Sequence, residues 1–88
     1  MGDVGIIYKI LPTDVSLNIN KLSNDIEKKL QGKCRIKGVQ IIPIAFGLQA
    51  IKMFIVVPDE ENASEKIENL IKEVDGVGEV DVEELSLL

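Results

Sequence analysis

The order in which two periodicities alternate along the chain constrains its fold most strongly. Apolar stretches with the two-residue period of strands alternate with stretches of helical period, in the order strand, helix, strand, strand, helix, strand. The two halves are similar in length and layout, and residues 43–47 join them. Because crossovers between strands of one sheet are right-handed, this order predicts an α+β ferredoxin-like sandwich, βαββαβ, a four-stranded antiparallel sheet with both helices on one face.

The first half predicts a strand, an amphipathic helix and a second strand. Residues 4–11 are apolar and rich in branched side chains, and Pro12 ends this strand. The helix is indicated by apolar residues at three- and four-residue spacing: Ile19, Leu22, Ile26 and Leu30. Gly32 lies where this helix should stop. Residues 33–42 begin with strict alternation, and a phase slip at Gly38 predicts a β-bulge in this strand.

The second half repeats the pattern. Residues 48–57 form the most strand-like stretch of the chain. Asn62 and Glu65 have the spacing of a capping box, which predicts that the Asn62 side chain caps the second helix. The apolar face of this helix comprises Ala63, Ile67, Leu70, Ile71 and Val74. Gly76 ends the helix, and residues 77–85 alternate valines with acids as a strand with one solvated face does.

Side chains suited to covalent catalysis are scarce in this sequence. It contains no histidine, which removes the usual general base near neutral pH and the commonest zinc ligand. Cys34 is the single cysteine, so we interpret it as a core residue, and an unpaired thiol fits the reducing cytoplasm. The acids at 59–61 favour the start of the next helix rather than a metal site. We therefore expect no catalytic residue, metal or cofactor, and a protein that acts by binding.

The charge and length of the chain limit its partners. A formal net charge of −5 argues against sequence-independent nucleic-acid binding, which depends on phosphate neutralisation. No apolar run reaches the roughly 18–20 residues that cross a bilayer. The 88 residues suit a single domain. We expect a cytoplasmic protein that is a monomer when free and has no direct nucleic-acid or membrane partner.

The junction between the halves carries a distinctive motif, PIAFGLQAIKMFIVVPDEE at residues 43–61. It resembles the guanine nucleotide exchange domain of the translation elongation factor 1-beta family. The family pattern has a proline, two small residues, Phe or Tyr, then Gly-Leu or Gly-Ile, a strand and an acidic turn. The starting MGDV and the later VDVEEL are similar to archaeal members, so the resemblance covers residues 1–88 as one exchange domain.

The resemblance implies a partner and a mode of contact. Family members bind the GTP-binding elongation factor 1-alpha and accelerate GDP release. In eukaryotic relatives the motif's aromatic enters a pocket on the second domain of the GTPase, which corresponds to Phe46 here. The expected contact residues around it are Pro43, Ala45, Phe46 and Gly47. The sequence alone leaves open whether Phe46 instead covers its own domain's core.

The C-terminal stretch departs from the eukaryotic pattern. Those relatives place a lysine next to the last residue, where it disturbs the magnesium and phosphate side of the nucleotide site, whereas this chain has Leu87. Either another lysine replaces it, or apolar contacts from Leu85, Leu87 and Leu88 move the GTPase segments around the nucleotide. A second expected contact is electrostatic: the cations Lys33, Arg35 and Lys37 share one side of a strand and would face an acidic surface of the GTPase.

Two other functions suit a ferredoxin-like fold. RNA-recognition modules stack bases on aromatics of the two central strands, which here offer only Tyr8 and Phe54. A small-molecule-binding regulatory domain is the other alternative, because the fold alone does not determine function.

Overall fold

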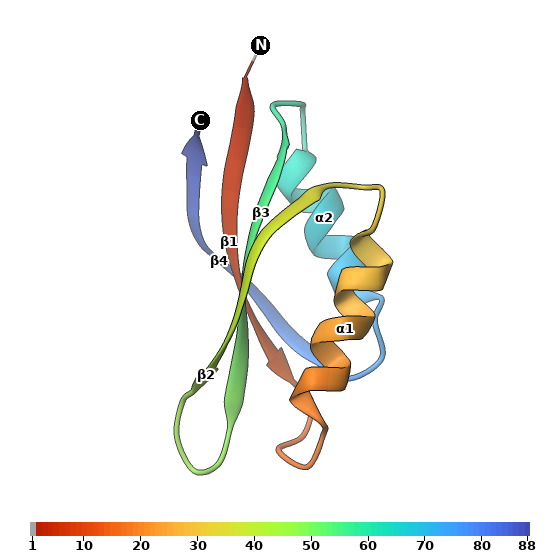
Figure 1. Ribbon diagram of the computed structural model, residues 1–88, viewed down its shortest axis with the longest axis vertical. Helices are drawn as coiled ribbons and strands as arrows, with labels where there is room; N and C mark the ends of the chain where they lie inside the picture. Colours follow the sequence, from red (N-terminus) through yellow and green to blue (C-terminus); the bar gives the residue numbers. More distant parts are fainter. Residues whose placement is uncertain (1) are drawn as a thin grey trace.

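The computed structural model of the protein describes residues 2–88, so Met1 of the MGDV stretch lies outside the described residues. The elements in chain order are β1 (Asp3–Pro12), α1 (Ile19–Leu30), β2 (Arg35–Pro43), β3 (Gln49–Pro58), α2 (Ala63–Lys72) and β4 (Val77–Leu87). The strands lie in the order β2-β3-β1-β4, and all neighbours are antiparallel. Both helices lie on the same side of the sheet (Figure 1). The predicted ferredoxin-like sandwich is confirmed.

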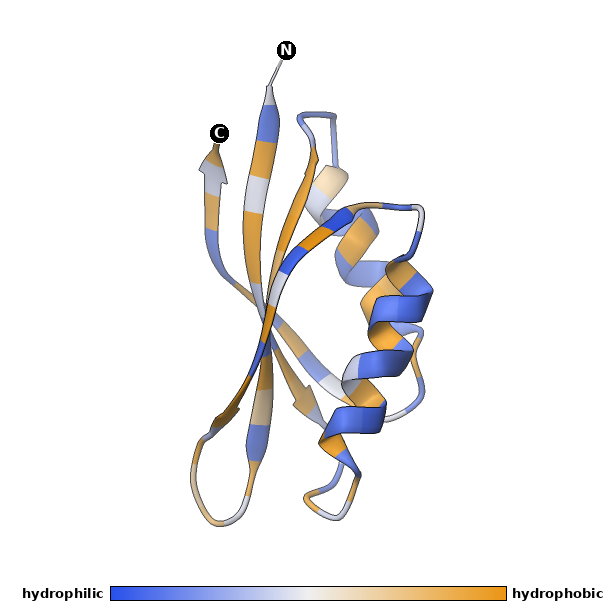
Figure 2. Cartoon of the chain, viewed as in Figure 1, coloured by the Kyte–Doolittle hydropathy of each residue, from blue (hydrophilic) through white to orange (hydrophobic). Residues whose placement is uncertain are grey.

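The core lies between the central strands and the helices. Alternate residues of β1 and β3 face the helices and have no exposed surface: Ile6, Tyr8, Ile10, Ile51, Met53 and Ile55. The predicted apolar faces of the helices pack against them, with Ile26, Leu30 and Ile71 fully buried. Figure 2 shows hydrophobic and hydrophilic residues alternating along both helices and the strands. Each such buried aliphatic side chain contributes about 1.5–3 kcal/mol, so this layer holds the sandwich together.

Tyr8 ties β1 to the start of α2. Its hydroxyl donates a hydrogen bond of 2.7 Å to the backbone carbonyl of Ser64. Desolvation by burial, reinforced by the negative charge of Glu68, raises the pKa of Tyr8, so the phenol keeps its proton and remains a donor.

Tyr8→Phe is expected to lower the free energy of unfolding by about 1 kcal/mol, because it removes this hydrogen bond to the Ser64 carbonyl. Urea unfolding at neutral pH would measure the change as a lower midpoint with an unchanged slope. An unchanged midpoint would mean that water replaces the hydroxyl at no cost.

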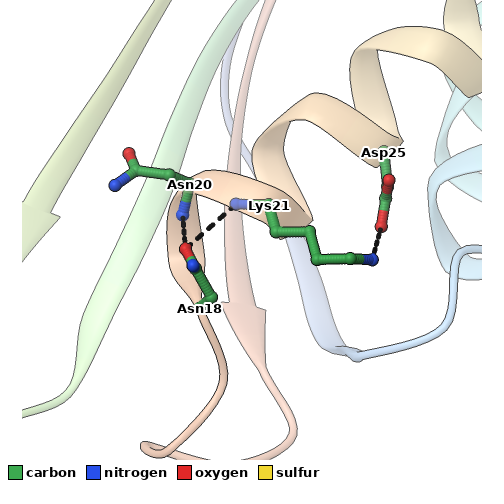
Figure 3. Close-up of polar contacts among 4 residues, drawn as sticks. All are labelled: Asn18, Asn20, Lys21 and Asp25. Atoms are coloured by element: carbon green, nitrogen blue, oxygen red, sulfur yellow. Dashed lines mark hydrogen bonds and ion pairs between the residues drawn. The ribbon is translucent and has the colours of Figure 1, made fainter.

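The start of α2 differs from the prediction, and the start of α1 has the side-chain cap that α2 lacks. Asn62 has left-handed backbone angles, φ 62° and ψ 23°, and its side chain makes no capping hydrogen bond, so the predicted capping box is wrong. A cap residue needs extended backbone angles for its side chain to reach the first free N–H groups. Asn18 has them, at φ −73° and ψ 105°, and caps α1. Its Oδ1 accepts bonds of 3.1 Å from the Asn20 N–H and 3.2 Å from the Lys21 N–H (Figure 3).

Bulges interrupt the pairing of both edge strands. The register between β2 and β3 shifts between Ile36 and Gly38, which makes Lys37 the extra residue and confirms the predicted bulge. A second shift, between β1 and β4, makes Glu83 the extra residue, and the sequence analysis did not predict it. The Glu83 carboxylate lies 3.3 Å from the Lys52 ammonium on β3. β4 also continues two residues beyond the predicted end, to Leu87.

Within residues 2–88, neither helix is long and apolar enough to cross a membrane.

Candidate partner-binding site

The loop between β2 and β3 holds Phe46 away from the rest of the protein. Two backbone hydrogen bonds of 2.8 Å close this loop, from Ile44 N–H to Leu48 O and from Leu48 N–H to Ala45 O. Phe46 has a positive φ of 52°, which is uncommon for a residue with a side chain. Its side chain is 102% exposed, so the ring does not cover the domain's own core. Of the two positions that the sequence left open for this ring, the structure has the outward one.

The neighbours of Phe46 determine how the ring is presented. Pro43 ends β2 opposite Gln49, and the loop starts directly after this pair. Gly47 has a φ of +79°, and a Cβ added there would meet nothing within 4 Å, so the backbone angle and not lack of space favours glycine. Ile44 is exposed as well, although the sequence analysis did not include it among the contact residues. Figure 2 shows hydrophobic colours along much of this projecting loop.

The C-terminal leucines lie on two different faces of the sheet. Leu85 pairs with Ile6 and Leu87 pairs with Val4, and both partners belong to the helix-facing core layer. Leu85 is nevertheless 52% exposed and Leu87 is 74% exposed. Figure 1 shows the reason, since the C-terminal half of β4 extends away from both helices. Leu88 lies on the opposite, open face, so the structure does not gather the three predicted leucines into one patch.

Val82 belongs with Leu85 and Leu87. It pairs with Tyr8 and is also exposed on the helix side of the sheet. The bulge at Glu83 keeps these side chains on one side, although their spacing in the sequence breaks the two-residue alternation. We name Val82, Leu85 and Leu87 the β4 strip. Alternation alone predicts a buried valine at this position, so Val82 was not among the contact residues expected from the sequence.

The Phe46 loop and the β4 strip are far apart. The molecule measures 42 × 21 × 18 Å, and its longest axis runs along the strands. Figure 1 shows the loop between β2 and β3 at one end of this axis and the C-terminal end of β4 at the other. A partner that contacts both the Phe46 loop and Leu87 must therefore reach along most of the length of the sheet.

The basic group is exposed, and its three cations lie just before and along the start of β2. Lys33 precedes β2, Arg35 begins it, and Lys37 is the bulge residue. Arg35 Nη2 lies 2.8 Å from Asp3 Oδ2, and among the described residues it is the one member of the group that forms an ion pair. An exposed ion pair of this kind contributes little to stability, so the group remains available to a partner.

The structure offers little for covalent chemistry. Over residues 2–88, no three His, Cys, Asp or Glu side chains gather as they would around a metal ion. Cys34 packs against the core as predicted, and its Sγ lies 4.0 Å from the Leu30 carbonyl oxygen. Burial raises the pKa of Cys34, which keeps the thiol protonated and a weak nucleophile.

The central strands do not form the aromatic platform of an RNA-recognition module. Tyr8 is fully buried on the helix side, so its ring cannot stack on a base. Phe54 is exposed on the open face without a second aromatic beside it in the described residues. The sequence had left both rings available to RNA, and burial of Tyr8 removes one of them.

Comparison with known proteins shows which family the chain resembles along its length. Residues 5–88 match the family described as the EF-1 guanine nucleotide exchange domain. Elongation factor 1-beta of Thermoplasma acidophilum is 38% identical over 88 residues, which cover 100% of both chains. Its counterpart in Staphylothermus marinus is 40% identical over 84 residues, or 94% of this chain and 93% of the relative. The counterpart in Methanocorpusculum labreanum is 38% identical over 100% of this chain and 99% of the relative.

The comparison with solved structures concerns the fold alone. The ACT domain from GTP pyrophosphokinase of Chlorobium tepidum superimposes with a TM-score of 0.66 over 91% of this chain and 97% of that domain. The sequences are 17% identical, so this likeness carries the ferredoxin-like fold and not a function.

Proposed function

We propose that this chain, which belongs to the EF-1 guanine nucleotide exchange domain family, contacts its GTPase through both ends of the sandwich. The family makes the protein a guanine nucleotide exchange factor of translation elongation, which promotes GDP release from elongation factor 1-alpha. The proposed contacts are the Phe46 loop with Pro43, Ala45 and Gly47 at one end, and the C-terminal leucines Leu85, Leu87 and Leu88 at the other.

The observation that carries this proposal is the complete exposure of the Phe46 ring. A solvated phenyl ring costs free energy, and a positive φ adds to that cost, so the free protein gains nothing from this placement. Burial of the ring in a partner's pocket removes the solvation cost and offsets the backbone strain, because a rigid aromatic buries a large area with little loss of conformational entropy. Ile44 beside it would extend the apolar contact.

The proposed mechanism is differential binding. A factor that binds the nucleotide-free GTPase more tightly than the GDP-bound form lowers the GTPase's affinity for GDP by the same ratio. Each 1.4 kcal/mol of this difference corresponds to about a tenfold change in affinity. Phe46 would hold the GTPase while the β4 strip changes the surroundings of the nucleotide, so the protein needs no catalytic residue, cofactor or metal of its own.

We further propose that residues 1–88 act as one domain that is a monomer when free and works in the cytoplasm, without direct nucleic-acid or membrane contact. The unpaired Cys34 and the formal net charge of −5 support these points.

The test is a nucleotide-release assay. Elongation factor 1-alpha from the same source is loaded with a fluorescent GDP analogue, and release is followed after excess unlabelled GDP is added with or without this protein. We expect release to accelerate in a saturable manner with the concentration of this protein. Release that stays at its spontaneous rate at all concentrations would refute the proposed function.

The basic group gives a separate prediction about association. Reversing the charges of Lys33, Arg35 and Lys37 to Glu is expected to slow association with the GTPase about tenfold at low salt and to flatten its salt dependence. The reason is the loss of attraction to an acidic surface on the partner. Stopped-flow fluorescence at several salt concentrations would measure both quantities.

A matched control removes the effect of net charge. Reversing Lys21, Lys66 and Lys72, which lie on the helices, changes the net charge equally at another surface. Asp3→Asn tests the loss of the ion pair with Arg35 by itself. Equal association rates for the two triple variants would show that the basic group only increases solubility.

A further inference from the structure

Gly5 lies in the middle of a strand where the backbone does not require glycine. It pairs with Val56 on β3 and with Ser86 on β4, on the open face of the sheet. Its φ is not positive, unlike those of Gly32, Gly47 and Gly76. A glycine within a strand weakens that strand and often marks a site where another group approaches closely. The group that approaches Gly5 is therefore informative.

Two side chains from distant parts of the chain occupy the space above Gly5. A Cβ added to Gly5 would lie 3.0 Å from Cε1 of Phe54 and 3.4 Å from both Cδ atoms of Leu88. Leu88 follows β4, and its backbone N–H donates a hydrogen bond of 2.8 Å to the carbonyl of Asp3. We name this arrangement of Leu88 over Gly5 beside Phe54 the Leu88 seat.

The Leu88 seat and the β4 strip lie on opposite faces of the same strand end. Leu87 projects to the helix side, while Leu88 is held on the open face. Residues at the end of an edge strand fray unless a contact holds them. The seat supplies that contact from the open face, opposite the side on which Leu85 and Leu87 project. Holding Leu88 on one face thus fixes the direction in which Leu87 projects from the other.

We propose that Gly5 is a positioning residue for nucleotide exchange: its missing side chain makes room for Leu88, and the seated Leu88 holds Leu87 toward the GTPase. This inference rests on the proposed function, in which the C-terminal end of β4 contacts the partner. Gly5 itself touches no partner in this proposal.

Gly5→Ala separates positioning from stability. The atoms that a new Cβ would meet are the far ends of the Phe54 and Leu88 side chains, which can rotate or shift without moving β1. Alanine also costs less conformational entropy than glycine in a strand. The substitution is therefore expected to leave the fold and the thermal midpoint nearly unchanged, while the Phe54 ring and the Leu88 side chain shift to make room for the new Cβ.

The experiment combines two readouts on the full chain. The first is NMR of the free protein, which measures two quantities for the Leu87 and Leu88 amides. The backbone heteronuclear NOE reports their order, and the rate of solvent exchange reports their protection. Gly5→Ala is expected to lower both NOE values and to speed exchange of the Leu88 amide at least fivefold. The second is the saturation curve of GDP release, in which the maximal rate is expected to fall at least threefold while the half-saturating concentration changes less than twofold.

Two further variants make the interpretation specific. Gly38→Ala is the matched control, because Gly38 is also a strand glycine without positive φ and a Cβ there would meet nothing within 4 Å. It is expected to leave both readouts at their wild-type values. Leu88→Ala removes the seated side chain, and Gly5→Ala is expected to have no additional effect on the rate in that background.

The outcomes separate the two proposals. The role of Gly5 is refuted, and the proposed function stands, if wild-type protein and Gly5→Ala accelerate GDP release equally. The same conclusion follows if Gly5→Ala lowers the rate by the same factor in the wild-type and Leu88→Ala backgrounds. If the wild type gives no acceleration, the proposed function fails and the positioning role fails with it. A Leu88 amide that is as ordered in Gly5→Ala as in the wild type would by itself refute the proposal that Gly5 makes room for Leu88.

Discussion

Phe46→Ala is expected to raise the concentration of this protein that half-saturates GDP release by about 30-fold to 1,000-fold. An aromatic anchor at the centre of an interface contributes about 2–4 kcal/mol to binding, and each 1.4 kcal/mol is a factor of ten. The ring is fully exposed in the free protein, so its removal costs the fold nothing and the thermal midpoint should not change. The measurement is the release assay over a wide concentration range, with binding measured independently by calorimetry.

Graded substitutions at the same position test whether the ring itself is responsible. Phe46→Tyr keeps the ring, and the family pattern that the motif resembles accepts Tyr, so it should retain more affinity than Phe46→Leu, which in turn should exceed Phe46→Ala. Equal half-saturating concentrations for wild type and Phe46→Ala would contradict docking through this loop. The exposure of Phe46 would then have no functional explanation.

The second large effect concerns the β4 strip. Replacing Leu85 and Leu87 together by alanine is expected to lower the maximal rate of GDP release about 30-fold. Each substitution removes three carbon atoms, and partial burial of these against the GTPase contributes about 1 kcal/mol per residue. The half-saturating concentration should change less, since Phe46 at the other end of the molecule still provides docking. The release assay at saturating concentrations measures the difference.

Two comparisons identify the chemistry of this contact. Val15→Ala removes another exposed apolar side chain, in the connection between β1 and α1, and should leave the rate unchanged. Leu87→Lys restores the cation of the eukaryotic pattern, and we expect it to slow release because the surroundings here are apolar. A faster release by Leu87→Lys would contradict apolar contact and favour a cationic mechanism.

Several features were predictable from the sequence because they depend on neighbours along the chain. The alternation of apolar residues in β1 and the helical spacing from Ile19 to Leu30 determine which face of each element must be buried. The phase slip at Gly38 marked the bulge at Lys37 for the same reason. The motif around Phe46 identified the family, since it requires a particular residue type at each of several adjacent positions.

Other features depend on residues far apart in the sequence. Asn18 and Asn62 look alike as cap residues, and only the backbone angles imposed by the preceding loops decide which one caps its helix. The spacing of Val82, Leu85 and Leu87 breaks the alternation, but only the pairing of β4 with β1 across the bulge at Glu83 shows that they share a face. No local pattern reports the register between two strands whose paired residues lie more than sixty positions apart in the sequence.

The sequence by itself determined the order of elements, the sandwich and the motif that presents Phe46, because local periodicity and turn chemistry specify each of these within a few residues. Only the tertiary structure decided that Phe46 faces solvent, that the C-terminal leucines divide between two faces, and that Leu88 covers Gly5 beside Phe54. The physical reason is that exposure and contact depend on which distant strands pair, in which register, and on how far the helices extend over the sheet.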